Sequence, residues 1–230
     1  MGENELFNII ISKGSLKQGV YNHTFSTFKL FKKILASLSE EYSRLDIQKQ
    51  QSIPFVYSDK GDFQFELEFA GDMLIFMMHT NIFEFSRYHE VMKTQYIRDD
   101  KERSYCGMIN IYNFLADSFR YNRFNDVGYL IGRIFINKDL HYFIEGKREI
   151  GYLFNNFGQA VMDERAARQI IESAILYTVN FDLLTPPFEN VKEVTVQDLL
   201  NTLDSMKIKT GKRLGFKFQG DHEELTLPSP

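Results

Sequence analysis

The chain has 230 residues, enough to bury about 70% of the surface that its unfolded form exposes. Hydrophobic residues make up 43% and charged residues 25%, which are globular proportions and exclude disordered and fibrous classes. The formal net charge is −4, and acidic and basic residues are interspersed, which argues against a nucleic-acid surface. The composition includes 22 Phe and 12 Tyr but no Trp, so many aromatic rings must be buried.

The cellular location is predicted from the cysteine count and from the apolar runs. The single cysteine, Cys106, excludes an intramolecular disulfide and a multi-cysteine metal site, and it favours a reducing compartment. Leu6–Ile11 is a short apolar stretch that Asn8 interrupts, and acidic residues precede it where an export signal needs basic ones. The run Met73–Met78 is far shorter than the roughly 20 residues of a membrane-spanning helix. We therefore expect a soluble cytoplasmic protein with no membrane partner, no nucleic-acid partner and no cofactor.

The first predicted helix runs from about Thr24 to Arg44. Its apolar residues recur at spacings of 3, 4, 3 and 4, which is typical of a helix with one buried stripe: Phe28, Phe31, Leu35, Leu38 and Tyr42. Lysines and glutamates occupy the other positions and indicate a solvated face.

An antiparallel sheet is predicted between Ile53 and Phe157. The expected strands, which turn residues such as Ala70-Gly71-Asp72 join into a meander, are Ile53–Ser58, Asp62–Phe69, Met73–Phe85, Val127–Ile136, Leu140–Glu145 and Ile150–Phe154. The segment Cys106–Tyr121 fits a helical and a strand pattern, and we favour a helix for its later part.

A second helix is predicted from Asp163 to about Val179, with acidic residues in its first turn and a buried stripe that includes Ile170, Ile171 and Ala174. The fold class is therefore α+β: a meander of about six to seven strands packed against two helices. We expect a core domain over residues 1–182. An appendage over 183–230 would contain the Pro186-Pro187 linker, a short helix after Thr195 and a final strand at Leu214–Phe218, and would pack on the core.

The strand Met73–Phe85 raises a question about its second face. Asp62–Phe69 alternates strictly, with Phe63, Phe65, Leu67 and Phe69 on one face, and so needs cover on one side only. Met73–Met78 is apolar on both sides. The second side of Leu74, Phe76 and Met78 could be covered by the C-terminal segment Pro186–Leu203, by a second copy of the chain or by an apolar ligand, and these three residues are the predicted interface.

Side chains that could carry chemistry lack the spacing of a known site. His79 and His141 fall in predicted strands, and neither belongs to a metal-binding or catalytic motif. Cys106 has no nucleophile signature around it, and a buried inert thiol is the favoured interpretation. No glycine-rich phosphate loop occurs in the sequence.

Two functional hypotheses follow. The first is a non-enzymatic module that binds a protein partner or forms a homodimer through Leu74, Phe76 and Met78. The second is a small-molecule binding protein or enzyme with a pocket between sheet and helix, lined by Tyr129, Arg133, His141 and Tyr142. The absence of a catalytic constellation favours the first.

Overall fold

The computed structural model describes residues 3–45, 53–146, 156–182, 185 and 187–197. The chain divides into two units, with the boundary between Asn180 and Phe181. The first unit contains a sheet and its helices. In the second unit the described residues include one short helix, α7, Phe188–Val191. The expected domain boundary after residue 182 and the packing of the appendage on the core stay predictions.

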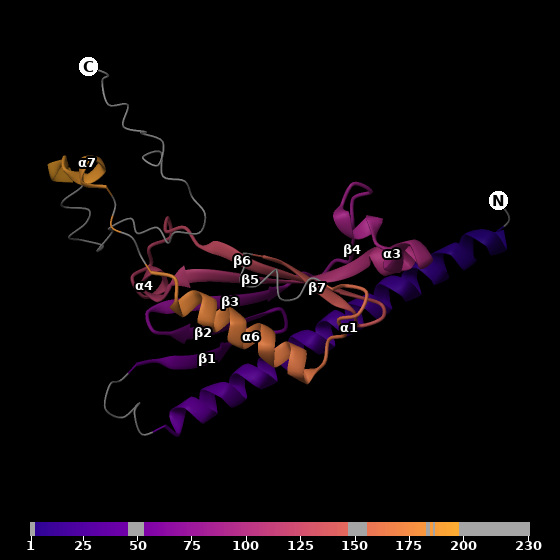
Figure 1. The fold of residues 1–230 in the computed structure, drawn as a ribbon, viewed down its shortest axis with the longest axis horizontal. Coiled ribbons are helices and arrows are strands. Elements are labelled where there is room, and N and C mark those ends of the chain that lie inside the picture. Colours follow the sequence, from indigo (N-terminus) through magenta and orange to yellow (C-terminus); the bar gives the residue numbers. More distant parts are fainter. Residues whose placement is uncertain (1–2, 46–52, 147–155, 183–184, 186, 198–230) are drawn as a thin grey trace, which may run out of the picture. The chain divides into compact units, whose positions relative to one another are not determined.

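The first helix, α1, spans Glu3–Ser43 and has 41 residues, so it begins about twenty residues before the predicted start. The part predicted from sequence is buried as expected, with Phe28, Phe31 and Leu35 each 0% exposed. The earlier part extends past the end of the sheet (Figure 1). This extension is the main feature of the helix that the sequence analysis missed.

The predicted α+β class is confirmed by a seven-stranded antiparallel sheet. Six strands lie in the order β1-β2-β3-β5-β6-β7, and β4 pairs separately with β5. Their bounds are β1 Phe55–Asp59, β2 Gln64–Phe69, β3 Asp72–Met78, β4 Phe83–Glu84, β5 Tyr105–Leu115, β6 Tyr129–Asn137 and β7 Tyr142–Gly146. The predicted strand Ile150–Phe154 lies outside the described residues.

The segment that fitted two patterns forms a strand followed by a short helix. Strand β5 takes up Tyr105–Leu115 and pairs with both β3 and β6. The helix α4 that follows covers only Ala116–Arg120. The helix favoured for the later part is confirmed over Ala116–Arg120, and the earlier part, which was left open, is a strand whose pairing on both edges satisfies its backbone groups.

The β2–β3 hairpin has the tight turn that its residues predict. Phe69 pairs with Asp72, which leaves Ala70 and Gly71 as a two-residue loop. Their φ angles are 47° and 87°, the positive values of a type I′ turn, whose twist matches that of the strands. Glycine adopts such angles freely, whereas alanine does not.

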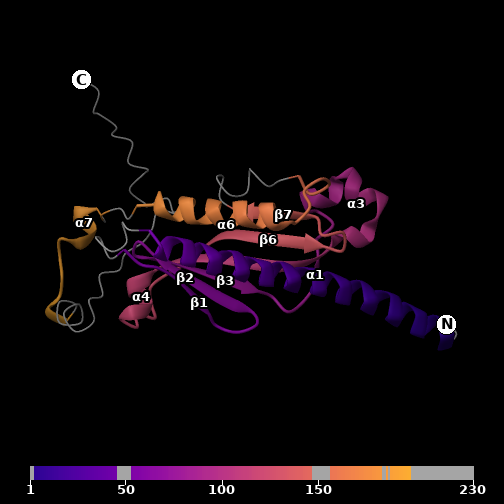
Figure 2. The same cartoon turned by 90° about the horizontal axis from the view of Figure 1, so that it is seen from below.

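Helices α1 and α6 lie on one face of the sheet, as seen from below in Figure 2. At Gly107 of β5 the helix approaches so closely that an added Cβ would overlap Thr24 of α1. Directly opposed strand residues share a face, so Ile136, which pairs with Gly107, also points toward the helices. We call this side the helix face and the other side the open face.

Aromatic rings join α1 to the sheet in the centre of the helix face. Phe28 contacts Phe65 at 4.8 Å between ring centroids, and Phe65 stacks on Phe76 at 4.6 Å. Phe31 meets Phe76 edge-on. Each ring contributes roughly 1.5–3 kcal/mol on leaving water, so this cluster fixes the position of the helix.

Helix α6 spans Glu164–Val179, in agreement with the prediction. Asp163 caps it by accepting a hydrogen bond from the backbone N–H of Ala166 at 2.7 Å. The side chain of Arg168 forms an ion pair with Glu41 at 3.3 Å, which ties α6 to α1.

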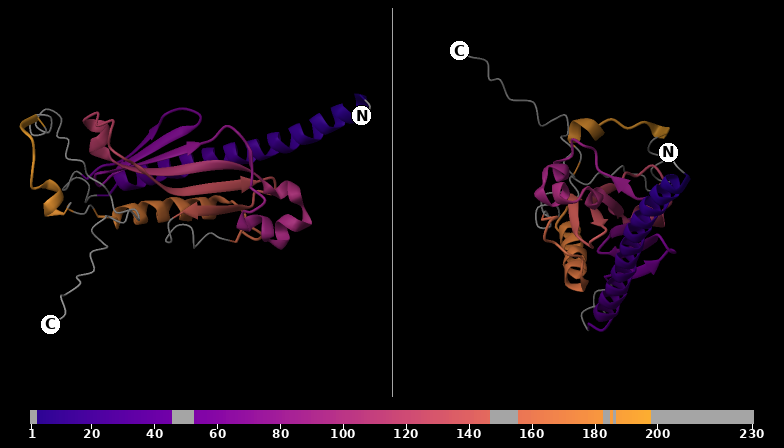
Figure 3. Two further views of the ribbon diagram at one scale, coloured as in Figure 1. Left: turned by 90° about the horizontal axis from the view of Figure 1, so that it is seen from above. Right: turned by 90° about the vertical axis from the view of Figure 1, so that its right-hand side faces the viewer.

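The open face is covered at one end by the chain's own residues 85–104. This segment contains three short helices: η1 Glu90–Lys93, α3 Gln95–Asp99 and η2 Lys101–Ser104. Their Val91 and Ile97 pack into a cluster with Cys106, Phe135 and Phe143. Figure 3, which views the sheet from above, shows these helices at one end of the strands. Residues 85–104 of the same chain therefore cover part of the second face of the sheet, whose covering the sequence left undetermined.

Candidate interaction surface

The predicted interface residues Leu74, Phe76 and Met78 lie on the helix face. On one side they lie opposite Leu67, Phe65 and Phe63. On the other side they pair with the residues of β5 that face the helices. Their exposed fractions are 0%, 0% and 4%. The residues of β3 that point to the open face are Met73, Ile75 and Met77, of which Met77 is 41% exposed. In the single chain, the predicted trio is therefore covered by the chain's own α1 and neighbouring strands, and its role as an interface stays a prediction.

The four predicted ligand residues are not brought together. Tyr142 is buried on the helix face, where it pairs with Ile136, and Tyr129 is half-buried on the same face opposite Asn113. Arg133 pairs with Glu145 on the open face. His141 lies before β7 with its ring stacked on Tyr96 at 5.0 Å. Burial raises the pKa of both Tyr129 and Tyr142, which keeps their hydroxyl groups neutral.

A charged group does form around Arg133 on the open face. Glu145 lies 3.5 Å from Arg133 Nη1 and 2.9 Å from His89 Nε2. The neighbouring Asn110, which pairs with Arg133 across the strands, donates to Tyr112 Oη at 3.3 Å. Asn110 Oδ1 and Arg133 Nε are buried without a hydrogen-bond partner among the described residues. Glu145 therefore links Arg133 and His89 on the open face.

His89 in this group has both ring nitrogens engaged. Nδ1 accepts the backbone N–H of Val91 at 3.2 Å, so the proton sits on Nε2, which donates to Glu145. The ring also packs against Phe85 at 4.7 Å. In this arrangement His89 caps η1 and positions Glu145, and neither nitrogen is free to act as a general base.

The other side chains weighed for chemistry have structural partners. Cys106 is 0% exposed, and burial raises the pKa of its thiol, which disfavours the reactive thiolate. His79 Nδ1 accepts the N–H of Asn81 at 3.0 Å. His141 Nδ1 lies 3.0 Å from the carbonyl oxygen of Phe157 and donates to it. Within the described part of the chain, His, Cys, Asp and Glu form no group of three that could hold a metal ion.

The first turns of α1 carry five exposed large apolar side chains within six residues. One stripe of α1 packs on the sheet at Thr24, Phe28 and Phe31. Toward the N-terminus it continues at spacings of 3 and 4 through Tyr21, Lys17, Gly14, Ile10 and Phe7. Beyond the sheet these positions meet solvent. Five large apolar side chains are about half exposed: Leu6 48%, Phe7 58%, Ile9 49%, Ile10 57% and Ile11 64%.

The projecting part of α1 is fixed to the sheet at Lys13. Its ammonium group donates a hydrogen bond to Tyr105 Oη and lies 3.9 Å from the ring centroid, a cation–π contact. Tyr105 in turn donates to Glu84 of β4 at 2.7 Å. The hydrogen bond to Tyr105 raises the pKa of Lys13, which therefore stays charged. The apolar turns are thus held in a defined direction.

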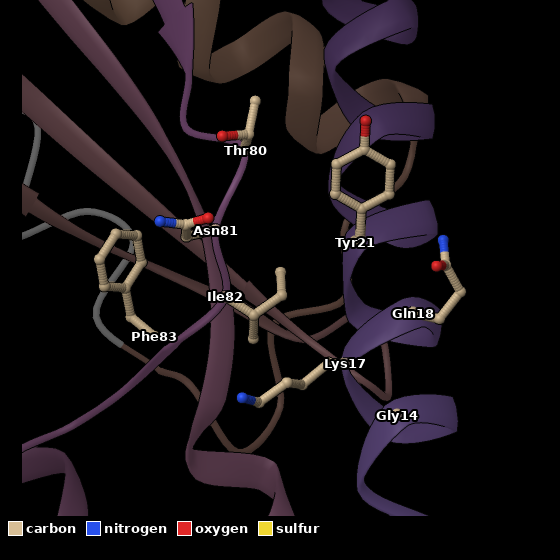
Figure 4. A pocket seen from close by; sticks show the side chains of 8 residues that line it. All are labelled: Gly14, Lys17, Gln18, Tyr21, Thr80, Asn81, Ile82 and Phe83. Atoms are coloured by element: carbon tan, nitrogen blue, oxygen red, sulfur yellow. The ribbon is translucent and has the colours of Figure 1, made fainter. Parts of the chain in front are cut away.

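A hollow of about 460 Å³ lies beside the projecting helix, between α1 and the segment that joins β3 to β4. Its lining comprises Gly14, Lys17, Gln18, Tyr21, Thr80, Asn81, Ile82 and Phe83. In Figure 4 the Lys17 side chain extends from α1 toward this segment, whereas Gln18 points away from it. A Cβ added to Gly14 would meet no atom within 4 Å. We call Leu6–Ile11 together with this hollow the α1 surface.

Comparison with protein-family models, curated proteins and solved structures finds no match to this chain. Among the described residues, no helix combines the length and the hydropathy needed to cross a membrane.

The α1 surface was missed by the sequence analysis for a local reason. Leu6–Ile11 was weighed only as an export signal, and Gly14 and Gly19 weaken the helical pattern around it. The signal that could have found it is the 3–4 spacing from Phe7 to Leu35, which passes through Gly14 and Lys17 without a break.

Proposed function

We propose that this protein is a non-enzymatic interaction module that docks a protein through the α1 surface. One observation carries the proposal: the apolar stripe of α1 continues past the sheet and stays uncovered. At roughly 200 Å² for a large side chain, five half-exposed residues leave on the order of 500 Å² of apolar surface in contact with water. That is at the upper end for a monomer, whose largest patch is about 300–600 Å² and is often functional.

The chemistry of the helix favours a protein partner over a lipid surface. The side of α1 away from the stripe carries the acidic Glu5 and the uncharged Asn8, Ser12 and Ser15. A helix that lies on a membrane usually carries lysine and arginine on that side, where they attract anionic lipids. Here the lysines of this stretch, Lys13 and Lys17, lie instead toward the sheet and the hollow.

Photo-crosslinking tests the proposal directly. A photoreactive amino acid placed at Ile10, on the stripe, should form an adduct with a protein in the native cells. The same group at Ser15, which is exposed on the other side of the helix, is the matched control and should form none. Equal labelling from both positions, or no adduct from Ile10, would refute the α1 surface as a docking site.

A small-molecule function remains the second candidate, and the hollow favours it. Its volume of about 460 Å³ falls in the range of ligand pockets, and Lys17 supplies a cation that forms no ion pair with the described residues. Native mass spectrometry of the purified protein reports retained ligand mass. An added mass that Lys17→Met abolishes would favour this function, and a bare chain would count against it.

A further inference from the structure

Protruding and recessed parts lie on the same face of α1. Phe7, Ile10, Gly14 and Lys17 recur at spacings of 3, 4 and 3 and so share one side of the helix. Phe7 and Ile10 project into solvent, at 58% and 57% exposure. Gly14 and Lys17 border the hollow. Phe7 and Lys17 are ten residues apart, about 15 Å along the helix.

We infer that the partner of the α1 surface is a second copy of this chain, in an antiparallel pair of α1 helices. The inference rests on the proposed function and names its partner. With a two-fold axis at the level of Ser12, residues equidistant from Ser12 meet. Ile10 of each copy then lies over Gly14 of the other, and Phe7 enters the hollow beside Lys17. The same surface thus serves both copies, as a two-fold interface requires.

The contacts in this pair suit the residues that make them. A bulky side chain over a glycine allows two helices to approach closely, as a knob fills a hole. Lys17, which has no ion pair among the described residues, gains the face of the Phe7 ring as a cation–π partner. Neither contact requires a change in the position of α1, which Lys13 and Tyr105 hold in place.

The available area also fits a dimer. A stable interface removes about 800 Å² of surface from each partner. The exposed apolar side chains on this side of α1, Leu6, Phe7 and Ile10, supply on the order of 300 Å² by the size of large side chains, and the rim of the hollow adds the segment Thr80–Phe83. The fully covered centre would be apolar and the rim polar, which is the usual anatomy of an interface.

Size-exclusion chromatography with light scattering on the full chain tests the pair, with two matched glycine variants. A Cβ added at Gly14 meets no neighbour within 4 Å, so Gly14→Leu can fill the recess, and leucine favours the helix more than glycine does. Gly19→Leu makes the same change five residues later, about 140° around the helix, where an added Cβ also meets nothing within 4 Å.

We expect a dimer for the wild type and for Gly19→Leu. Gly14→Leu should weaken dimerisation roughly tenfold or more without lowering the melting temperature, because it overfills the contact.

A third variant and two further readouts complete the test. Ile10→Glu removes the protruding side and should give a monomer that remains folded, since Ile10 is 57% exposed. A monomeric wild type, or a dimer that persists in Gly14→Leu, would overturn the inference, and so would a loss of the dimer in Gly19→Leu. Cosedimentation of the wild type with anionic phospholipid vesicles would also overturn it. If the Ile10 crosslink joins a different protein, the proposed function stands and only the second copy is refuted.

Discussion

Gly107 of β5 lies directly beneath Thr24 of α1, so close that an added Cβ would overlap the threonine side chain. The contact sets the distance between the helix and the sheet, because both partners are completely or almost completely buried. It also fixes where α1 leaves the sheet, and hence where the α1 surface begins.

This contact predicts a large effect of a small substitution. Gly107→Ala should lower the free energy of unfolding by about 1–3 kcal/mol, the usual cost of overfilling a packed core. Urea denaturation measures it. Gly14→Ala is the control: its Cβ meets nothing within 4 Å, so it should raise stability by about 1 kcal/mol through helix propensity. Thr24→Ala combined with Gly107→Ala should recover part of the loss, and strict additivity of the two changes would contradict the contact.

The β2–β3 turn should be improvable. Ala70 has a φ of 47°, in the left-handed region that costs a residue with a Cβ about 1–2 kcal/mol. Asparagine tolerates this conformation better, and Asn-Gly is the preferred pair in a type I′ turn. Ala70→Asn should therefore raise the midpoint of thermal unfolding. A decrease would mean that the turn has another conformation in solution.

Asn113 on the helix face should be replaceable with a gain in stability. Its side chain is 0% exposed between Leu74 and Tyr129, and neither amide atom has a hydrogen-bond partner among the described residues. An unsatisfied buried polar group costs about 1–3 kcal/mol. Asn113→Leu should recover part of this cost in denaturant unfolding. Thr178→Val on α6 is a companion change of nearly equal shape, since Thr178 Oγ1 is unsatisfied as well. Destabilisation by both would indicate polar partners at these sites.

Stability should fall in acid because two aspartates have lowered pKa values. The hydrogen bond from Lys32, at 2.7 Å, lowers the pKa of Asp59, and that from Lys138 lowers the pKa of Asp100. A carboxyl group whose pKa is lower in the folded state stabilises the fold above its unfolded pKa of 3.8 and loses this contribution as the pH falls through the folded value.

Thermal unfolding followed from about pH 6 to pH 2 checks this prediction. Each partly exposed pair should contribute less than about 1 kcal/mol, because solvent screens it. Asp59→Asn and Asp100→Asn should each make the melting temperature depend less steeply on pH below pH 4. At higher pH the dependence should be unchanged. A steeper acid transition in either variant would contradict the assignment.

The local pattern of residues determined much of the fold. The stripe Phe28–Tyr42 and the Asp163 cap predicted the buried part of α1 and all of α6, because spacing and capping act within a few residues. Alternation in Gln64–Phe69 and the Ala70-Gly71 pair predicted the β2–β3 hairpin for the same reason. The adjacency of β1, β2 and β3, and that of β6 and β7, followed from their short connections.

The candidate site depended on contacts between distant segments, which local patterns do not contain. Alternation in β3 defines two faces, but only the register with β2 and the packing of Phe31 decide that Leu74, Phe76 and Met78 lie under α1. Arg133 and His141 were predicted to line one pocket. A strand pattern shows that side chains alternate between two faces, but it does not show which face residues of two different strands have in common.

The sequence by itself therefore determined most of the elements, apart from the first half of α1 and strand β5, and it determined which side chains are apolar. Only the tertiary structure decided which apolar positions are covered. Phe7 and Phe28 belong to one helical stripe and are equivalent in pattern, yet Phe7 is 58% exposed and Phe28 is 0% exposed. The difference arises because the sheet ends between them, and the length of a sheet is set by the pairing of its strands.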